Sequence, residues 1–382
     1  MILRPYRQAG SSAVYRPTAE IHLGRLRSNY RAVANHVGGA KVLAIVKADG
    51  YGHGLLPVAQ ALEQEGVFGF GVALLPEALA LRKGGLKNFI LHMGRFDPET
   101  LSIYTDSEIR LSIQSMDDLE HLRAHHVAGG RTMTAHLKID TGMGRLGVPY
   151  DQAIEALEII RGSDFIRLEG LFSHFATADE EEPSFVSYQL ARFGQFVHMV
   201  RKLGMEVDYF HIANSSAIVR YPESHFNMVR PGLMLYGLTP SPHVVPPFEI
   251  DPVMELKAPL VLVKQLPKGA PVGYGRTFRT PKPTHIGMVQ IGYHDGLPIA
   301  LSDVGHVGLG GKVYPLVGRV SMDMCNIDLG NDSPPIGSEV LIWGRSDDPR
   351  LTAVGQAALA GQNLYELLTQ VGNRVERLYV DS

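Results

Sequence analysis

The sequence contains a single cysteine, Cys325, among 382 residues. One cysteine cannot form an intrachain disulfide, which is typical of proteins in a reducing compartment. The chain has no run of lysine or arginine, and its net charge of −3 argues against a nucleic-acid-binding surface. No apolar stretch is long enough to span a bilayer, and the start MILRPYRQAG lacks the apolar core of a signal peptide. We therefore expect a cytoplasmic protein that binds neither nucleic acid nor a membrane.

The length and the spacing of apolar segments indicate the fold. A chain of 382 residues with 45% hydrophobic and 20% charged residues is expected to be globular and to form two domains. Eight strand-like runs alternate with helical periodicity, a pattern typical of a (β/α)8 barrel. The runs lie at 42–46, 67–73, 89–94, 109–113, 133–140, 167–175, 207–213 and 228–236. The predicted helices lie at 23–37, 55–66, 76–85, 115–127, 149–162 and 187–204.

The composition changes at 239–252, where five prolines exclude a regular helix or a central strand. Beyond this linker the pattern is β-rich, with one helical stretch at 353–371 and a last strand at 374–380. We therefore predict an α/β protein. A (β/α)8 barrel over 15–245 is followed by a smaller, mostly β domain over 246–382, and residues 1–14 are candidates for packing with that second domain.

The segment KVLAIVKADGYGHG at 41–54 is the most informative stretch. Val42 to Val46 form the unbroken apolar run of a strand that is buried on both faces. Lys47 follows at the carboxyl end of this strand, where α/β proteins place their chemistry. Desolvation there lowers the pKa of an ammonium group and makes the amine a nucleophile suited to Schiff-base formation. The alternative is that Lys47 is merely the first solvated residue after the strand.

The fifth predicted strand, HLKID, carries three polar residues in alternation. His136, Lys138 and Asp140 are expected on one face of the strand, and Arg145 follows in the loop TGMGRLG. The alternative for Lys138 and Asp140 is a structural salt bridge inside the barrel. The loop also matches G-x-G-x-x-G, but we reject dinucleotide binding because this strand does not open a βαβ unit and because Arg145 and Pro149 fit that fingerprint poorly.

Polar residues also follow predicted strands six to eight. His174 is expected at the barrel mouth, and Ser215 follows Asn214 at the start of a helix, where hydroxyls and free amides bind anions. Arg230 precedes Gly232, a position where the backbone can approach a ligand closely. The alternative is an ordinary capping serine and an ordinary turn glycine. Because barrels commonly bind phosphate after strands seven and eight, the joint placement favours a phosphate site.

A strand-end lysine, a phosphate corner and a neighbouring arginine together suggest pyridoxal 5'-phosphate. With these features the chain resembles the alanine racemases, the fold-type III pyridoxal-phosphate enzymes. The resemblance runs from about residue 16 to the end. It rests on the motifs VKADGYGHG, LKIDTGMGRLG, SHFATAD, HIANSSA, NMVRPGLMLYG, VGYGRTF, IGYHDGLP, VGRVSMDM and NLYEL.

The resemblance implies an isomerase that interconverts L-alanine and D-alanine, supplies D-alanine for peptidoglycan, and acts as a homodimer with shared active sites. Lys47 would bind the cofactor as a Schiff base and act as one proton-transfer base, and Tyr274 of the partner subunit would be the other. Arg230 would face the pyridine nitrogen, with His174 between Arg230 and Tyr274. No metal is expected. The phosphate would be held by Tyr51, Ser215, Gly232, Leu233 and Tyr365.

The resemblance also implies a substrate pocket. Arg145 would bind the substrate carboxylate and the phenolic oxygen of the cofactor, and Tyr293, Met322 and Asp323 would complete the pocket from the other subunit. Lys138 matches a lysine that is often carbamylated in this family. A carbamate would convert two repelling cations into an anion that orients the Arg145 guanidinium.

Physical chemistry accounts for these roles. Racemisation returns a proton to the face opposite the one that lost it, so two bases are needed. A lysine and a tyrosine serve at neutral pH only if burial or cationic neighbours lower their pKa values. An arginine at the pyridine nitrogen cannot give up its proton, which weakens the ring as an electron sink and limits side reactions.

Three rival functions remain at this point. A decarboxylase of the same architecture should carry an acid at the ring nitrogen and a late catalytic cysteine, so Arg230 and Cys325 count against it. A non-catalytic, cofactor-carrying barrel would not need the second domain. A racemase with broader specificity, for serine, lysine or arginine, stays open because small pockets discriminate by modest energies. Asp49, Gly50 and Ser321 depart from the residues frequent in the family, and none of these departures removes a role.

Overall fold

The computed structural model describes residues 15–381, and the expected packing of residues 1–14 lies outside this part of the chain. The described chain forms two compact units. The larger unit contains residues 21–254 and 379–381, and the smaller contains residues 15–20 and 255–378. The chain passes from one unit to the other within strands β1 (Thr18–His22), β11 (Met254–Leu266) and β19 (Glu376–Val380). The division between residues 245 and 246 stays a prediction.

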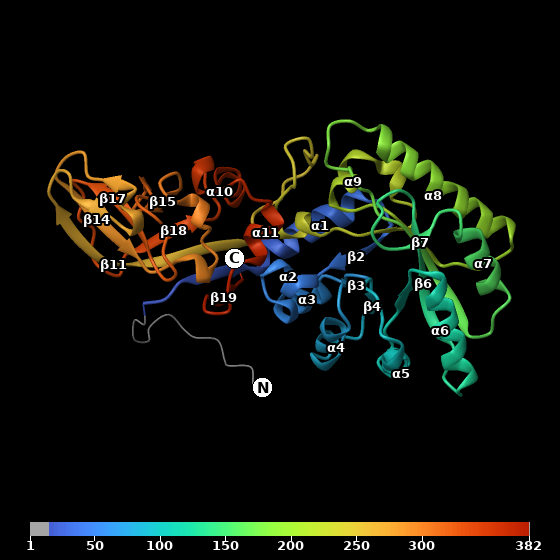
Figure 1. The fold of residues 1–382 in the computed structure, drawn as a ribbon. Helices are drawn as coiled ribbons and strands as arrows, with labels where there is room; N and C mark the ends of the chain where they lie inside the picture. The colour runs from blue at the N-terminus through green and yellow to red at the C-terminus, as the bar shows by residue number, and fades with distance from the viewer. Residues whose placement is uncertain (1–14, 382) are drawn as a thin grey trace. The chain divides into compact units, whose positions relative to one another are not determined.

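The larger unit is built on eight parallel strands, as predicted (Figure 1). One set runs in the order β10-β2-β3-β4 and a second in the order β5-β6-β8-β9, and the two-residue strand β7 (Val148–Pro149) pairs with β6 off this path. A parallel bridge between Leu91 and Arg110 joins β4 to β5, and the Arg230 amide donates to the Ala213 carbonyl at 2.9 Å where β9 and β10 end. The strands are β2 (Lys41–Ile45), β3 (Gly69–Val72), β4 (Phe89–His92), β5 (Leu111–Ile113), β6 (Met133–Asp140), β8 (Ile166–Phe172), β9 (Tyr209–His211) and β10 (Met228–Val229).

The predicted helices are present on the outside of these strands (Figure 1). In α1, the buried residues Leu26, Tyr30 and Val33 recur at helical spacing, which fixes the face that packs inward. Two short helices, α5 and α9, fill gaps in which six residues are too few to show a period. The helices are α1 (Leu23–His36), α3 (Leu55–Gln64), α4 (Leu75–Lys83), α5 (Leu101–Asp106), α6 (Met116–Val127), α7 (Ala153–Arg161), α8 (Ser184–Lys202) and α9 (Ser215–Arg220).

The eighth strand is much shorter than predicted. The run at 228–236 forms a strand only over β10 and then the short helix η3 (Leu233–Tyr236). Pro231 has no amide hydrogen to donate to a ladder. Gly232 next adopts φ −117° and ψ −97°, which redirects the chain. The apolar run therefore leaves the strand after Val229 and continues as a short helix.

The smaller unit is mostly β, as predicted. Its largest sheet has the order β16-β15-β18-β11-β1-β19, and β14 and β17 extend it through β11. The helical stretch predicted over 353–371 is wrong as a single helix, because Gly361 at φ 62° ends α10 (Ala353–Ala360) before α11 (Leu364–Thr369) begins. The remaining strands are β12 (Pro271–Val272), β13 (Phe278–Arg279), β14 (Thr284–Val289), β15 (His306–Leu309), β16 (Lys312–Pro315), β17 (Cys325–Gly330) and β18 (Glu339–Trp343).

The segment at 239–252 forms neither helix nor strand, as its prolines predict. No helix within residues 15–381 combines the length and the apolar character needed to cross a membrane.

Candidate active site

Lys47 follows β2 and begins α2 (Lys47–Tyr51), a turn with an unusual backbone. Ala48, Asp49, Gly50 and Tyr51 all lie in the left-handed region, with φ between 53° and 61°. Outside glycine such a conformation costs about 1–2 kcal/mol per residue. Asp49 and Gly50 are residue types that tolerate this region, so these two departures from the family pattern suit the turn.

Surrounding contacts hold this turn in place. The Ala48 amide donates to Glu77 at 2.7 Å, and the Leu55 amide donates to the Asp49 carboxylate at 2.8 Å. The His53 ring lies 2.9 Å, through Nδ1, from the Tyr51 carbonyl oxygen. The strained backbone is therefore fixed from three sides, which determines where Lys47 leaves the barrel wall.

The Lys47 amine is suited to nucleophilic chemistry. Burial lowers its pKa, the charge of Arg145 lowers it further, and Glu77 opposes the shift. Across residues 15–381, no carboxylate lies within ion-pair distance of Lys47 Nζ. A neutral amine is more accessible here than at an ordinary surface lysine.

Lys138 lies inside the barrel on β6 and is 6% exposed. Burial and the positive charges of Arg230 and Arg145 lower the pKa of Lys138 to about 7. Asp140 does not pair with it: the carboxylate accepts the amides of Gly142, Met143 and Gly144 at 2.8–2.9 Å, which shapes the loop that carries Arg145. The structural salt bridge considered for Lys138 and Asp140 is therefore not formed.

Arg230 is buried at the barrel mouth and is 4% exposed. Its guanidinium donates to His211 Nδ1 at 2.9 Å, to His174 Nδ1 at 3.2 Å and to the Ser173 carbonyl at 2.7 Å. Burial lowers the pKa of Arg230 to about 9. Burial and then the Arg230 charge hold the pKa of His174 well below its usual value. His174 is therefore neutral, and because Nδ1 accepts, its proton is on Nε2.

The carboxyl ends of β2, β9 and β10 bring the predicted phosphate residues together. The Gly232 amide donates to the Ser215 hydroxyl at 2.9 Å, and Leu233 follows directly at the start of η3. A Cβ atom at Gly232 would lie 2.7 Å from the Tyr51 hydroxyl oxygen, so a larger residue would displace that hydroxyl. Two hydroxyls therefore face the same small corner of the barrel mouth.

The remaining predicted residues belong to the smaller unit. Tyr274 begins the short turn η4 (Tyr274–Arg276) between Gly273 and Gly275, whose φ angles are 70° and 72°. The Tyr274 side chain is 72% exposed. A glycine on each side lets the chain turn sharply enough to present the phenol outward. Tyr365 is the second residue of α11.

Tyr293 and Met322 lie on neighbouring segments of the smaller unit. The amides of Tyr293 and His294 donate to the carbonyls of Ser321 and Met322 at 3.0 and 3.2 Å. Asp323 accepts a 2.7 Å hydrogen bond from Arg374, which also binds Asp295. The Asp323 side chain is therefore anchored. The Ser321 hydroxyl donates to the Met324 carbonyl at 2.7 Å, so this departure from the family pattern closes a turn.

Sequence reasoning missed Glu77, Ser173 and His211 as supports of the site. The only available signal was a histidine in the strand segment YFHIAN, at a position that alternation directs into the barrel.

The chain was compared with known families and solved structures. The alanine racemase N-terminal domain matches residues 21–240, and the alanine racemase C-terminal domain matches residues 253–379. The alanine racemase of Streptomyces coelicolor is 38% identical over 383 residues, covering 97% of each chain.

Two solved structures are similar over nearly the whole chain. Alanine racemase from Bacillus anthracis, with bound L-Ala-P, has a TM-score of 0.89 and 32% identity, covering 97% of this chain and 96% of that one. Alanine racemase from Bartonella henselae, with covalently bound pyridoxal phosphate, has a TM-score of 0.86 and 28% identity, covering 96% and 99%. With both domain families matched in order and close relatives over its full length, the chain belongs to the alanine racemase family.

Proposed function

We propose that this chain interconverts L-alanine and D-alanine with pyridoxal 5'-phosphate. The observation that carries the proposal is the Lys47 amine, which has a lowered pKa and lies on the same barrel unit as the Tyr51 and Ser215 hydroxyls beside Gly232. An amine and an anion site at the ends of parallel strands fit a phosphate-bearing aldehyde. When bound, this cofactor withdraws electrons from the substrate Cα and makes its proton removable.

The residues present fit that cofactor. Tyr51, Ser215, Gly232 and Leu233 would hold its phosphate, with Tyr365 contributed by the smaller unit. Lys47 would attach to it covalently, and Arg230 would face its ring nitrogen. Arg145 would bind the substrate carboxylate, and Tyr293, Met322 and Asp323 would close the pocket.

Arg230 favours racemisation over decarboxylation. Arg230 stays protonated at neutral pH and donates to uncharged acceptors, so it can offer the ring nitrogen a hydrogen bond but does not transfer a proton to it. Cys325 is buried, and burial raises its pKa to about 12, so it cannot act as the thiolate that a decarboxylase would need. Both observations support the racemase proposal.

Two bases would move the proton. Lys47, once neutral, can take or give a proton at Nζ on one side of the substrate, and the Tyr274 phenol would do so on the other. His174 carries its own proton on Nε2, so that nitrogen can donate to the phenolic oxygen and stabilise the phenolate. This arrangement would place one base on each face of the substrate.

We also propose that the active enzyme is a homodimer with shared sites. Large apolar side chains are exposed on the smaller unit, which marks surfaces that a partner covers. A base with a 72% exposed phenol needs a surrounding surface to exclude water. These exposed residues include Tyr274, Tyr293, Ile299, Val304, Met322 and Met324.

A mixing experiment tests whether each active site is built from both subunits. Lys47→Ala and Tyr274→Phe homodimers should each be nearly inactive. Refolded together in equal amounts, they should regain about a quarter of wild-type activity, because half the dimers are mixed and each has one intact site. Ultracentrifugation should show a dimer. No gain on mixing, or a fully active monomer, would contradict shared sites.

We propose that Lys138 is carbamylated, because a buried amine with a pKa of about 7 is largely neutral at physiological pH and can react with carbon dioxide. Without carbon dioxide, the same shift affects stability. Unfolding restores a pKa of 10.5, so between about 7 and 10.5 the unfolded chain binds more protons and stability rises with pH.

Lys138→Met should remove this rise. In buffer free of carbon dioxide, the variant should exceed the wild type in free energy of unfolding near pH 7, and the difference should shrink by up to a few kcal/mol near pH 10. Urea unfolding at both pH values measures the difference. Lys87→Met, at an exposed lysine, should follow the wild type. Parallel profiles for Lys138→Met and the wild type would contradict the shifted pKa.

The direct test of function is incubation of the purified protein with cofactor and L-alanine, L-serine or L-lysine, followed by chiral chromatography. D-alanine should form fastest. Rapid racemisation of serine or lysine would instead favour the broader-specificity alternative, and release of carbon dioxide would favour a decarboxylase. A cytoplasmic location and a role in supplying D-alanine for peptidoglycan remain predictions.

A further inference from the structure

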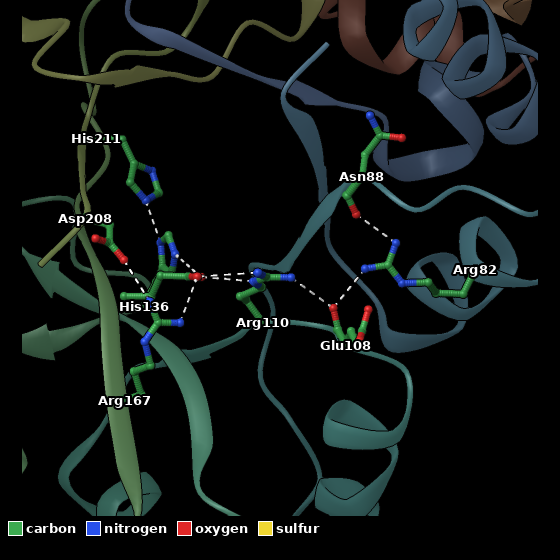
Figure 2. Close-up of polar contacts among 9 residues, drawn as sticks. Arg82, Asn88, Glu108, Arg110, His136, Arg167, Asp208 and His211 are labelled. Carbon is green, nitrogen blue, oxygen red and sulfur yellow. Dashed lines mark hydrogen bonds and ion pairs between the residues drawn. The ribbon is translucent and has the colours of Figure 1, made fainter. Parts of the chain in front are cut away.

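A chain of polar side chains runs through the barrel interior, from Arg230 toward the amino ends of the strands. It connects Arg230 to His211 on β9, then to His136 on β6, and ends at Glu169 on β8. Figure 2 shows the His211 and His136 rings pointing toward one another, with Arg110 and Arg167 approaching from the other side. His136 and His211 are fully buried, and Glu169 is 5% exposed.

The first two contacts are hydrogen bonds, because Arg230 lies 2.9 Å from His211 Nδ1 and His211 Nε2 lies 2.8 Å from His136 Nδ1. The third is a longer electrostatic contact, with His136 Nε2 3.6 Å from a Glu169 carboxylate oxygen and no hydrogen bond formed by that nitrogen. The Phe172 ring stacks on His211 at 4.9 Å between centroids. A Cβ atom at Gly170 would lie 2.2 Å from His136 Nδ1, so glycine on β8 makes room for the second ring.

The chemistry of the first residue fixes the direction of every hydrogen bond. A guanidinium only donates, so His211 Nδ1 must accept and carries no proton. Burial lowers the pKa of His211 well below its usual value, so the ring is neutral and its proton is on Nε2. His136 Nδ1 must then accept. Burial likewise lowers the pKa of His136, and its proton is therefore on Nε2, facing Glu169.

The chain ends at an anion held by two arginines. Arg110 binds both Glu169 carboxylate oxygens, at 3.0 and 3.4 Å, and Arg167 lies 3.4 Å from one of them. Burial raises the pKa of Glu169, but the nearby His136 ring and the hydrogen bonds from Arg110 outweigh burial and hold it at about 2. The carboxylate is thus charged at any working pH, and every donor in the chain points toward it.

We propose that Arg230, His211, His136 and Glu169 form a positioning relay, in which Glu169 anchors two single-tautomer imidazoles that hold the Arg230 guanidinium against the cofactor ring. This rests on the role proposed above for Arg230. Glu169 is a positioning residue, because it acts through two rings and lies toward the opposite end of the barrel from the reacting atoms. The negative charge of Glu169 also offsets the positive charge of the buried Arg230 guanidinium, which donates to no carboxylate.

The tautomers can be measured without catalysis. Nitrogen-15 NMR of histidine-labelled holoenzyme should show two neutral rings, both protonated on Nε2, unchanged between about pH 6 and pH 9. Their assignment uses His136→Gln and His211→Gln. A doubly protonated ring at either position, or a proton on either Nδ1, would overturn the relay. This result decides the relay even if the protein does not racemise alanine.

A matched pair of carboxylates tests the anchor. Glu169→Gln should lower kcat about tenfold in both directions and change KM for alanine less than about twofold, while the His211 nitrogen signals shift. Asp208→Asn removes a charge from the same cluster, since Asp208 binds Arg167 at 3.0 Å, but it contacts neither ring. Asp208→Asn should behave as wild type, and Glu169→Asp should have a higher kcat than Glu169→Gln. Equal losses in Glu169→Gln and Asp208→Asn, or no loss in Glu169→Gln, would overturn the proposal.

Discussion

Replacing Lys47 with alanine should abolish covalent cofactor attachment and lower racemisation at least about 10⁴-fold. The reason is that one amine is proposed to serve both as the attachment point and as one of the two bases. The purified wild type should be yellow after cofactor addition, and the variant should lack this absorbance. Loss of both roles at one position makes this the largest effect expected in the molecule.

A matched lysine provides the control. Lys41 is exposed at the start of the same strand, and Lys41→Ala should keep both colour and activity. Borohydride reduction followed by peptide mass mapping should place the pyridoxyl label at position 47 in wild type and Lys41→Ala alike. A label at another lysine, or a wild type that stays colourless, would end the proposal for Lys47.

Replacing Tyr274 with phenylalanine should have the second largest effect, and an asymmetric one. Removing the phenol deletes the base on one face only. Proton abstraction from L-alanine should fall about 10³-fold, while abstraction from D-alanine, assigned to Lys47, should fall far less. Exchange of the Cα hydrogen in deuterated water, measured separately for each enantiomer, reports the two steps.

Tyr314→Phe is the matched control, because that phenol lies in the same unit and donates to Asp332 at 2.7 Å. It should leave both exchange rates near wild type. Equal losses from both enantiomers in Tyr274→Phe would mean that the tyrosine acts on binding or structure and not as a base on one face.

The barrel could be predicted because its strands are continuous apolar runs with turns between them. Residues 42–46 show this clearly, and the observed strand is β2 at Lys41–Ile45. Elements of two to six residues could not be predicted in the same way. The hairpin of β12 and β13 and the helix α5 are shorter than the window in which a period becomes visible.

The candidate site could be predicted where polar residues follow strands, as at Lys47 and Ser215. The relay could not, because its members come from β6, β8, β9 and the residue after β10 and meet only through register. His136 pairs with Gly170, and Phe172 pairs with His211. Glu169 falls within the segment IRLEGLF, two residues after Arg167, and this spacing gives no sign that the carboxylate points inward and is neutralised by arginines.

The left-handed turn after β2 has a consequence for local stability. Its backbone strain is released when the turn opens, so freeing the Lys47 segment requires loss of a few contacts from Glu77, Asp49 and His53, whereas the paired strands can stay intact. A bound cofactor would connect Lys47 with the phosphate-binding residues around Ser215 and so restrain the turn. The turn would then gain stability from its ligand.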